Sequence, residues 1–290
     1  MNKIYSLLLY RFVWLISLLP YKMLYIISDF FSFLLCYVFK YRKKVIETNL
    51  RNSFPEKSDN EIFNIRKKFY KHISDYFLET VKLLSVSEKE IKKRCKFLNA
   101  EMLEEYYKDG KSVLVILGHY ANWELMCNYT LWSENIDFMP IYKPLHNKAM
   151  DYLYIKMRSR FGAKPLAKND VFRTLLKYKK EGILSLTAFV GDQTPRKKNI
   201  QYWTSFLNQD TPIFLGVDKI AHKLQSPVVF VNMNKVKRGY YEVELIEITK
   251  DASKLPLHAL TETHTRMLEN QIRKNPEYWL WSHRRWKHKR

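Results

Sequence analysis

Short, continuously apolar runs recur along the chain. Residues 113–117, with the sequence VLVIL, are rich in β-branched side chains and end at Gly118. Strands that are covered on both faces have this composition. Strand-forming composition and periodicity predict further strands at 136–141, 183–189, 227–232 and 240–248. We therefore expect β-strands that lie inside the protein.

Helical spacing separates these runs. Residues 59–84 place apolar side chains three and four positions apart, with Ser58 or Asp59 available as a cap. The members of this stripe are Ile62, Ile65, Phe69, Ile73, Phe77 and Val81. Further helices are predicted at 122–132, 147–161, 170–180, 213–224 and 259–274. This alternation predicts an α/β fold with a central, mostly parallel sheet flanked by helices.

The first 39 residues differ, because two long apolar runs are separated only by a short break at Pro20. The second run, residues 23–39, has 17 residues and contains Asp29. A membrane span needs about 20 mostly apolar residues. Three interpretations are open: a tilted single span, an interfacial helical hairpin, or a buried helical pair of a soluble protein.

A basic cluster follows this segment directly. It comprises Lys40, Arg42, Lys43 and Lys44. Positive residues beside a membrane segment favour the cytoplasmic side. We therefore expect residues 1–44 to form a membrane anchor. Residues 45–290, which contain no repeat and no Gly/Ser linker, are expected to form one domain facing the cytoplasm. Three cysteines without paired spacing agree with a reducing compartment.

Charge restricts the class of partner. Fifty Lys and Arg against 29 Asp and Glu give a formal charge of +21. An anionic partner is expected: nucleic acid, a membrane surface, an acidic carrier protein or a phosphorylated substrate. The tail WLWSHRRWKHKR, residues 279–290, interleaves aromatic and basic side chains, which suits a membrane interface and would also suit stacking on nucleic acid. We favour anionic membrane lipids over nucleic acid.

The segment HYANWE, residues 119–124, carries the candidate chemistry. Asn122 is a suitable helix N-cap, so His119 is expected between strand and helix, where sites of α/β sheets gather. Side chains five residues apart cannot meet within one helix or one strand, but a corner could bring His119 and Glu124 together. The alternative is structural: a satisfied histidine, and a carboxylate favoured in a first helical turn.

The sequence lacks the motifs of several classes of enzyme, namely nucleotide-binding enzymes, serine hydrolases and zinc enzymes. The seven glycines supply neither G-x-G-x-x-G nor a P-loop, and there is no G-x-S-x-G elbow. Cysteine and histidine pairs at zinc spacing are absent from the sequence, so no metal site is predicted. What remains is a histidine with an acidic orienting partner, which can act as a general base towards a substrate hydroxyl.

HYANWE resembles the H-x4-D/E motif of the lysophospholipid acyltransferase superfamily, and its N-W-E form is similar to the bacterial late acyltransferases of lipid A biosynthesis, the lauroyl and myristoyl acyltransferases. Further blocks follow this family in order, among them NLRNSFPE (49–56), RSRFGA (158–163), GDQTP (191–195) and NPEYWLWSHRRWK (275–287). The resemblance covers the chain from the apolar N-terminal segment to the C-terminus.

The resemblance implies transfer of a fatty acyl chain from a thioester to a hydroxyl of a lipid A precursor, without a metal or organic cofactor. The implied donor is acyl carrier protein, with a coenzyme A thioester as the alternative. It also implies an enzyme of the bacterial inner membrane whose catalytic domain faces the cytoplasm.

The resemblance further implies roles for individual residues. His119 is the expected general base, and Glu124 the carboxylate that fixes its tautomer. The residues expected to line the substrate site are Asn122, Arg158, Arg160 and Asp192. Arg158 and Arg160 diverge on a helix, so one of them is expected to face solvent. Asp192 follows the third predicted strand, where it could reach His119 or form a turn before the next proline.

Two segments, residues 193–195 and 202–211, depart from the family pattern and leave the acceptor open. The same machinery could acylate a lysophospholipid, an aminolipid or a glycolipid. A basic membrane-surface protein that keeps the fold without turnover is the alternative from another functional class.

Overall fold

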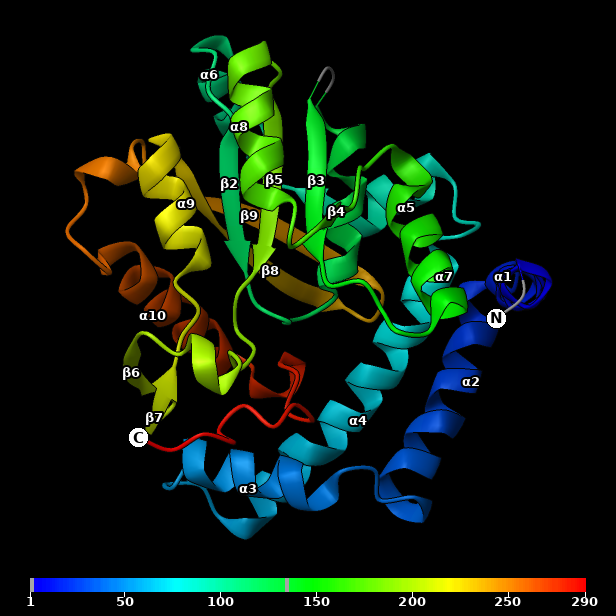
Figure 1. Ribbon diagram of the computed structural model, residues 1–290. Coiled ribbons are helices and arrows are strands. Elements are labelled where there is room, and N and C mark those ends of the chain that lie inside the picture. Colours follow the sequence, from blue (N-terminus) through cyan, green and yellow to red (C-terminus); the bar gives the residue numbers. More distant parts are fainter. Residues whose placement is uncertain (1–2, 134–135) are drawn as a thin grey trace.

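A seven-stranded sheet forms the centre of the protein in the computed structural model, which describes residues 3–133 and 136–290 (Figure 1). The strands are β1 (Cys95–Phe97), β2 (Val113–Leu117), β3 (Asp137–Tyr142), β4 (Leu166–Ala167), β5 (Ser185–Val190), β8 (Val228–Lys237) and β9 (Tyr240–Thr249). They lie in the order β1-β9-β8-β2-β5-β3-β4, and only the β8–β9 pair is antiparallel. The predicted α/β fold with a mostly parallel sheet is confirmed.

Outside this sheet, β6 (Trp203–Phe206) and β7 (Gln209–Pro212) form a separate antiparallel pair. The α-helices of the described chain are α1 (Lys3–Ser17), α2 (Tyr21–Phe33), α3 (Lys43–Ser53), α4 (Asp59–Lys82), α5 (Glu88–Arg94), α6 (Glu101–Lys108), α7 (Lys148–Arg158), α8 (Val171–Glu181), α9 (Gly216–Leu224) and α10 (Ala259–Lys274). Short 3₁₀ helices occupy Trp123–Leu131, Ser159–Phe161, Lys197–Asn199, Ala252–Lys254 and Pro276–Tyr278.

The central strand β2 explains why its sequence is continuously apolar. Val113, Val115 and Leu117 pack into one hydrophobic cluster. Leu114 and Ile116 pack into a second cluster, together with side chains of α8 and α9. Because successive side chains of a strand point to opposite faces, each face of the sheet has its own core.

The segment predicted as an α-helix over 122–132 is instead a 3₁₀ helix, Trp123–Leu131. The expected cap does not form, because Asn122 makes no side-chain capping bond. Its amide donates to Glu79 of α4 instead (2.9 Å), so a tertiary contact replaces the local one.

Helix α4 is buried on more than one side. Ser58 and Glu61 form a reciprocal capping box at its start, as the cap prediction requires. The predicted apolar stripe is buried as far as Ile73, but Phe77 is exposed and the neighbouring Tyr76 is buried. Further along α4, the carboxylate of Glu79 joins the helix to two segments, because Tyr25 of α2 donates to one of its oxygens and Asn122 of HYANWE donates to the other.

The N-terminal segment packs along the domain rather than standing apart from it. Helix α2 runs beside α4 on the outside of the molecule, and α1 lies near α7 (Figure 1). A π-helix, Leu34–Val38, continues α2. The combined segment Tyr21–Val38 has 18 residues and is long and apolar enough to cross a membrane, by length and composition.

The aromatic and basic tail divides between core and surface. Arg284, Lys287, Lys289 and Arg290 are exposed, but its first two tryptophans are not the membrane-facing rings that the composition predicts. Trp279, Trp281 and Arg285 are fully buried in the domain. The Trp281 indole donates to the Pro276 carbonyl (2.6 Å) and Arg285 donates to the Pro212 carbonyl (2.8 Å). The rings fill the core beside the small β6–β7 sheet, because Trp279 and Phe206 meet edge to face.

Candidate active site

The strand register brings His119 and Asp192 together. Strands β2 and β5 are parallel neighbours, with Leu117 opposite Val190. Continuing this register by two residues pairs position 119 with position 192. Both side chains therefore leave the carboxyl ends of adjacent strands at the same level, which is where sites of α/β sheets form.

The contact between these two residues is direct and double. The backbone N–H of His119 donates to Oδ2 of Asp192 (2.9 Å), and its ring Nδ1 lies 2.5 Å from Oδ1. On the other side of the ring, the Gln193 side-chain nitrogen lies 3.2 Å from Nε2. An ionised carboxylate only accepts and an amide nitrogen only donates. The contacts with Asp192 and Gln193 therefore indicate that the His119 ring carries its proton on Nδ1 and that Nε2 is an acceptor.

Asp192 is held in its charged form. Burial alone would raise the pKa of its carboxyl group. The facing His119 ring, the His119 N–H and the Trp279 indole (2.7 Å) outweigh burial and hold that pKa below its ordinary value. A charged Asp192 is what keeps the Nδ1 proton of His119 in place.

Gly118 allows this close approach. A Cβ atom added there would lie 2.6 Å from Cδ1 of Leu268 on α10 and 3.3 Å from the Asp192 carboxylate. A larger residue would therefore push against the packed helix and the carboxylate. The glycine that ends the predicted strand serves packing around the site.

Glu124 has a different partner from the one that the family resemblance implies. Arg158 donates to both of its oxygens, from Nε (2.8 Å) and Nη2 (2.6 Å). No hydrogen bond joins Glu124 to His119 within residues 3–133 and 136–290. The expected His119–Glu124 contact is therefore replaced by His119–Asp192, because a fixed guanidinium takes up both carboxylate oxygens.

Of the other residues expected to line the substrate site, two lie in the interior and one lies on the surface. Arg158 is mostly buried at the end of α7. Burial alone would lower its pKa, but the facing Glu124 outweighs burial and raises that pKa. Arg160 is exposed, so the two arginines diverge as predicted. Asn122 is fully buried and donates to Glu79, which directs its amide to the support of the segment.

Residues that sequence patterns did not indicate hold the HYANWE backbone. Ala121 adopts a left-handed conformation with φ of +51°, which side chains rarely favour. Its N–H donates to the Tyr278 carbonyl (3.0 Å) and its carbonyl oxygen lies 3.2 Å from Nε2 of His72 on α4. Trp123 stacks on Tyr76 of α4 at 4.2 Å. These contacts join segments distant in sequence, so local patterns carried no signal for them.

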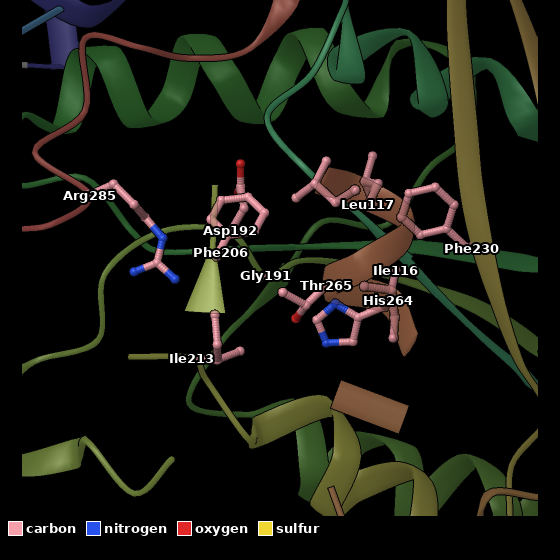
Figure 2. A pocket seen from close by; sticks show the side chains of 11 residues that line it. Ile116, Leu117, Gly191, Asp192, Phe206, Ile213, Phe230, His264, Thr265 and Arg285 are labelled. Carbon is pink, nitrogen blue, oxygen red and sulfur yellow. The ribbon is translucent and has the colours of Figure 1, made fainter. Parts of the chain in front are cut away.

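A small pocket lies behind Asp192. Figure 2 shows Arg285 reaching it from the C-terminal segment and His264 from α10. Its water-accessible volume is about 10 Å³, roughly the space for one water molecule. Burial lowers the pKa of Arg285 to about 10 and that of His264 to about 4. On this side, the Asp192 carboxylate therefore faces basic side chains and a closely packed apolar lining.

The arrangement suits removal of a proton from a hydroxyl. His119 is partly exposed, while Asp192 is buried, so Nδ1 is the oriented nitrogen and Nε2 is the one that keeps a free lone pair as an acceptor. No group of three or more His, Cys, Asp or Glu side chains that could hold a metal occurs in the part of the chain that the structure describes.

Comparisons with known proteins point to one family. Residues 2–288 match the family described as bacterial lipid A biosynthesis acyltransferase. A lipid A biosynthesis lauroyltransferase of Escherichia coli is 24% identical over 280 residues, covering 95% of this chain and 89% of that protein. A palmitoleoyltransferase of the same organism is 21% identical, covering 95% and 88%. A lipid A biosynthesis acyltransferase of Haemophilus influenzae is 22% identical, covering 81% and 72%.

Proposed function

Since the chain belongs to the bacterial lipid A biosynthesis acyltransferase family, we propose that this acyltransferase moves a fatty acyl chain from a thioester to a hydroxyl of a lipid A precursor. The observation that carries the chemistry is the His119–Asp192 pair, in which Asp192 holds Nδ1 and Nε2 acts as an acceptor towards the Gln193 amide. The Gln193 amide is the group that the hydroxyl would displace.

In the proposed reaction, Nε2 of His119 removes the proton of the acceptor hydroxyl as its oxygen attacks the thioester carbonyl. Asp192 stabilises the resulting imidazolium through the Nδ1 hydrogen bond. The tetrahedral intermediate then expels the thiolate, which takes the proton back from Nε2. An ester forms, the C–S bond breaks, and His119 returns to its starting state.

Arg158 is proposed to bind an anionic oxygen of the substrate. Its bidentate pair with Glu124 uses two N–H groups, whereas a guanidinium has five. Glu124 would therefore act by fixing the direction of the guanidinium. Exposed Arg160 contributes to the positive surface of the protein.

The donor is proposed to be acyl carrier protein, which the family resemblance implies, with a coenzyme A thioester as the alternative. Both donors are anionic and suit a chain with a charge of +21. The site of action is proposed to be the cytoplasmic face of the bacterial inner membrane. Residues 1–44 would attach the enzyme there, and residues 45–290 would carry out the transfer.

A purified-enzyme assay tests this function. The full chain is incubated with an acyl carrier protein thioester and a lipid A precursor, and products are identified by mass spectrometry. The precursor should gain one acyl chain, and His119→Ala should reduce the rate on the order of 10² to 10⁴. A product only on a lysophospholipid, aminolipid or glycolipid would reject the proposed acceptor. Folded His119→Ala enzyme with unchanged rate would reject the proposed base.

A further inference from the structure

The N-terminal helices have one apolar side that faces away from the protein. On α2, Met23, Ile26, Phe30 and Phe33 recur at helical spacing, and Ile26 is 70% and Phe30 60% exposed. On α1, the exposed stripe is Ile4, Leu8, Phe12 and Leu15. Large contiguous apolar surfaces are unusual on soluble monomers and mark interaction sites.

The opposite side of α2 is polar and is bound to the domain. Tyr25 donates to Glu79 (3.0 Å) and Ser28 donates to Asp75 (2.7 Å), both on α4. Asp29 pairs with Arg238 (2.7 Å) at the turn between β8 and β9. Tyr25, Ser28 and Asp29 are three and four residues apart, so they form one face of the helix.

Contacts with α4 extend along the whole length of α2. Before α2 begins, the Lys82 ammonium group donates to the carbonyls of Ser17 (2.7 Å) and Leu19 (3.0 Å). Beyond its far end, the Tyr70 hydroxyl donates to the Tyr41 carbonyl (2.7 Å). Helix α2 therefore lies antiparallel to α4, attached at both ends and in the middle.

This attachment is incompatible with a helix that crosses a bilayer. Asp29 lies in the middle of the apolar segment Tyr21–Val38, and its partner Arg238 belongs to the catalytic domain. If α2 crossed, Asp29, Arg238 and the α4 carboxylates would enter the hydrocarbon layer. Charged groups at that depth are costly and are rarely exposed to lipid.

We propose that α1 and α2 lie flat in one leaflet of an anionic bilayer, with their exposed stripes about 5 to 10 Å deep, and that neither helix crosses it. This inference rests on the proposed membrane location and makes it more specific. Of the interpretations open from the sequence, it selects the interfacial hairpin.

Charge favours a lipid surface over a second copy of the chain. Arg11, Lys22, Lys40 and Lys44 are exposed on or beside the apolar helices. An anionic headgroup layer attracts such residues. A second copy would instead present another positive surface, because the whole chain carries a charge of +21.

Labelling of two cysteine variants tests the topology. Lys22→Cys and Lys40→Cys place a thiol near each end of the apolar segment, and the three native cysteines are buried. Full-length protein in inside-out membrane vesicles is treated with a membrane-impermeant maleimide, with the unaltered chain as background. Both variants should react equally without detergent. A variant that reacts only after detergent addition, or a protein absent from the vesicles, would overturn the proposal.

A second experiment tests the lipid-binding stripe. The double variant Ile26→Glu with Phe30→Glu should bind anionic liposomes at least about tenfold more weakly, because two large apolar side chains lose their burial. Phe172→Glu with Leu257→Glu is the matched control, since these two side chains are also exposed but lie elsewhere. Unchanged liposome binding together with dissociation of an oligomer would show an interface between copies and reject the lipid surface.

These outcomes are separate from the fate of the proposed function. Labelling and liposome binding do not depend on turnover. If the enzyme fails to acylate a lipid A precursor, the proposed acceptor is rejected. The labelling and liposome experiments still test how α1 and α2 contact the membrane.

Discussion

The site contains two pairs of a buried carboxylate with a nitrogen base, and they differ in chemistry rather than burial. In the His119–Asp192 pair, the side chains are 18% and 3% exposed. In the Arg158–Glu124 pair, they are 19% and 4% exposed. Arginine stays charged in proteins and binds both oxygens of its partner, whereas histidine can release and accept a proton. At equal burial, one pair therefore keeps its charges fixed, and the other contains a base that can exchange a proton.

The difference also lies in what each pair leaves open. Both oxygens of Glu124 are occupied by one residue, so in this pair only the arginine has hydrogen-bonding groups left for a substrate. His119 uses one ring nitrogen for Asp192 and meets only the Gln193 amide at the other. The first pair suits fixed orientation, and the second suits transfer of a proton.

The largest expected effect separates the two carboxylates by activity. Asp192→Asn should lower acyl transfer on the order of 10³, because an amide no longer fixes the tautomer or stabilises the imidazolium. Initial rates and melting temperature are measured together with those of Glu124→Gln. If Glu124→Gln abolishes turnover in folded protein while Asp192→Asn remains active, the roles assigned to the two pairs must be exchanged.

Stability should respond more strongly to Glu124→Gln than to Asp192→Asn, the opposite of the order expected for activity. Glu124→Gln leaves the mostly buried Arg158 without a counter-charge, so the free energy of unfolding should fall by about 3 kcal/mol. Adding Arg158→Met should restore part of this loss without restoring activity. Urea denaturation of the single and double variants measures both effects. Arg160→Ala is the control, and because Arg160 is exposed, its stability should remain close to that of the parent.

His264 is a buried histidine with no acidic hydrogen-bond partner among the described residues, unlike His119, so its contribution to stability should depend on pH in a different way. Burial lowers the pKa of His264 to about 4, against an unfolded value of about 6.5. Between these values the unfolded chain binds more protons, so stability should fall by roughly 2 to 3 kcal/mol as pH drops from about 6.5 to 4. His264→Leu should flatten this slope, measured by urea unfolding across the range. An unchanged slope in this variant would assign the effect to other groups.

The smallest effect concerns the space behind the reactive pair. Gly118→Ala should lower stability by about 1 to 2 kcal/mol, because the added methyl group meets Leu268, and the shift of Asp192 should reduce activity. Gly191→Ala is the matched control, since its added Cβ would meet no atom within 4 Å. Thermal melts and rates of both variants measure the difference. Equal effects would show that Gly118 is not needed for packing.

Sequence patterns were reliable where the physical cause is local. Residues 113–117 formed β2, with every side chain buried, because apolar side chains on both faces of a strand need burial. Residues 240–248 formed β9, whose buried side chains alternate with more exposed ones over much of its length. Of the two expected caps, Ser58 caps the helix and does so in a capping box with Glu61. The sequence also indicated His119 at a strand end, since only a connection there can carry a polar side chain out of the sheet.

Partners of the polar side chains were decided by the tertiary structure. Glu124 is five residues from His119, but Asp192, 73 residues away, contacts it, because the β2–β5 register brings the two strand ends together. Composition placed Trp279 and Trp281 at a membrane, yet they are buried, because an aromatic ring is equally suited to a lipid interface and a protein core. Local sequence sets which elements form and which groups can react. The register of distant strands and the packing of helices determine which of those groups meet, since these depend on the whole chain at once.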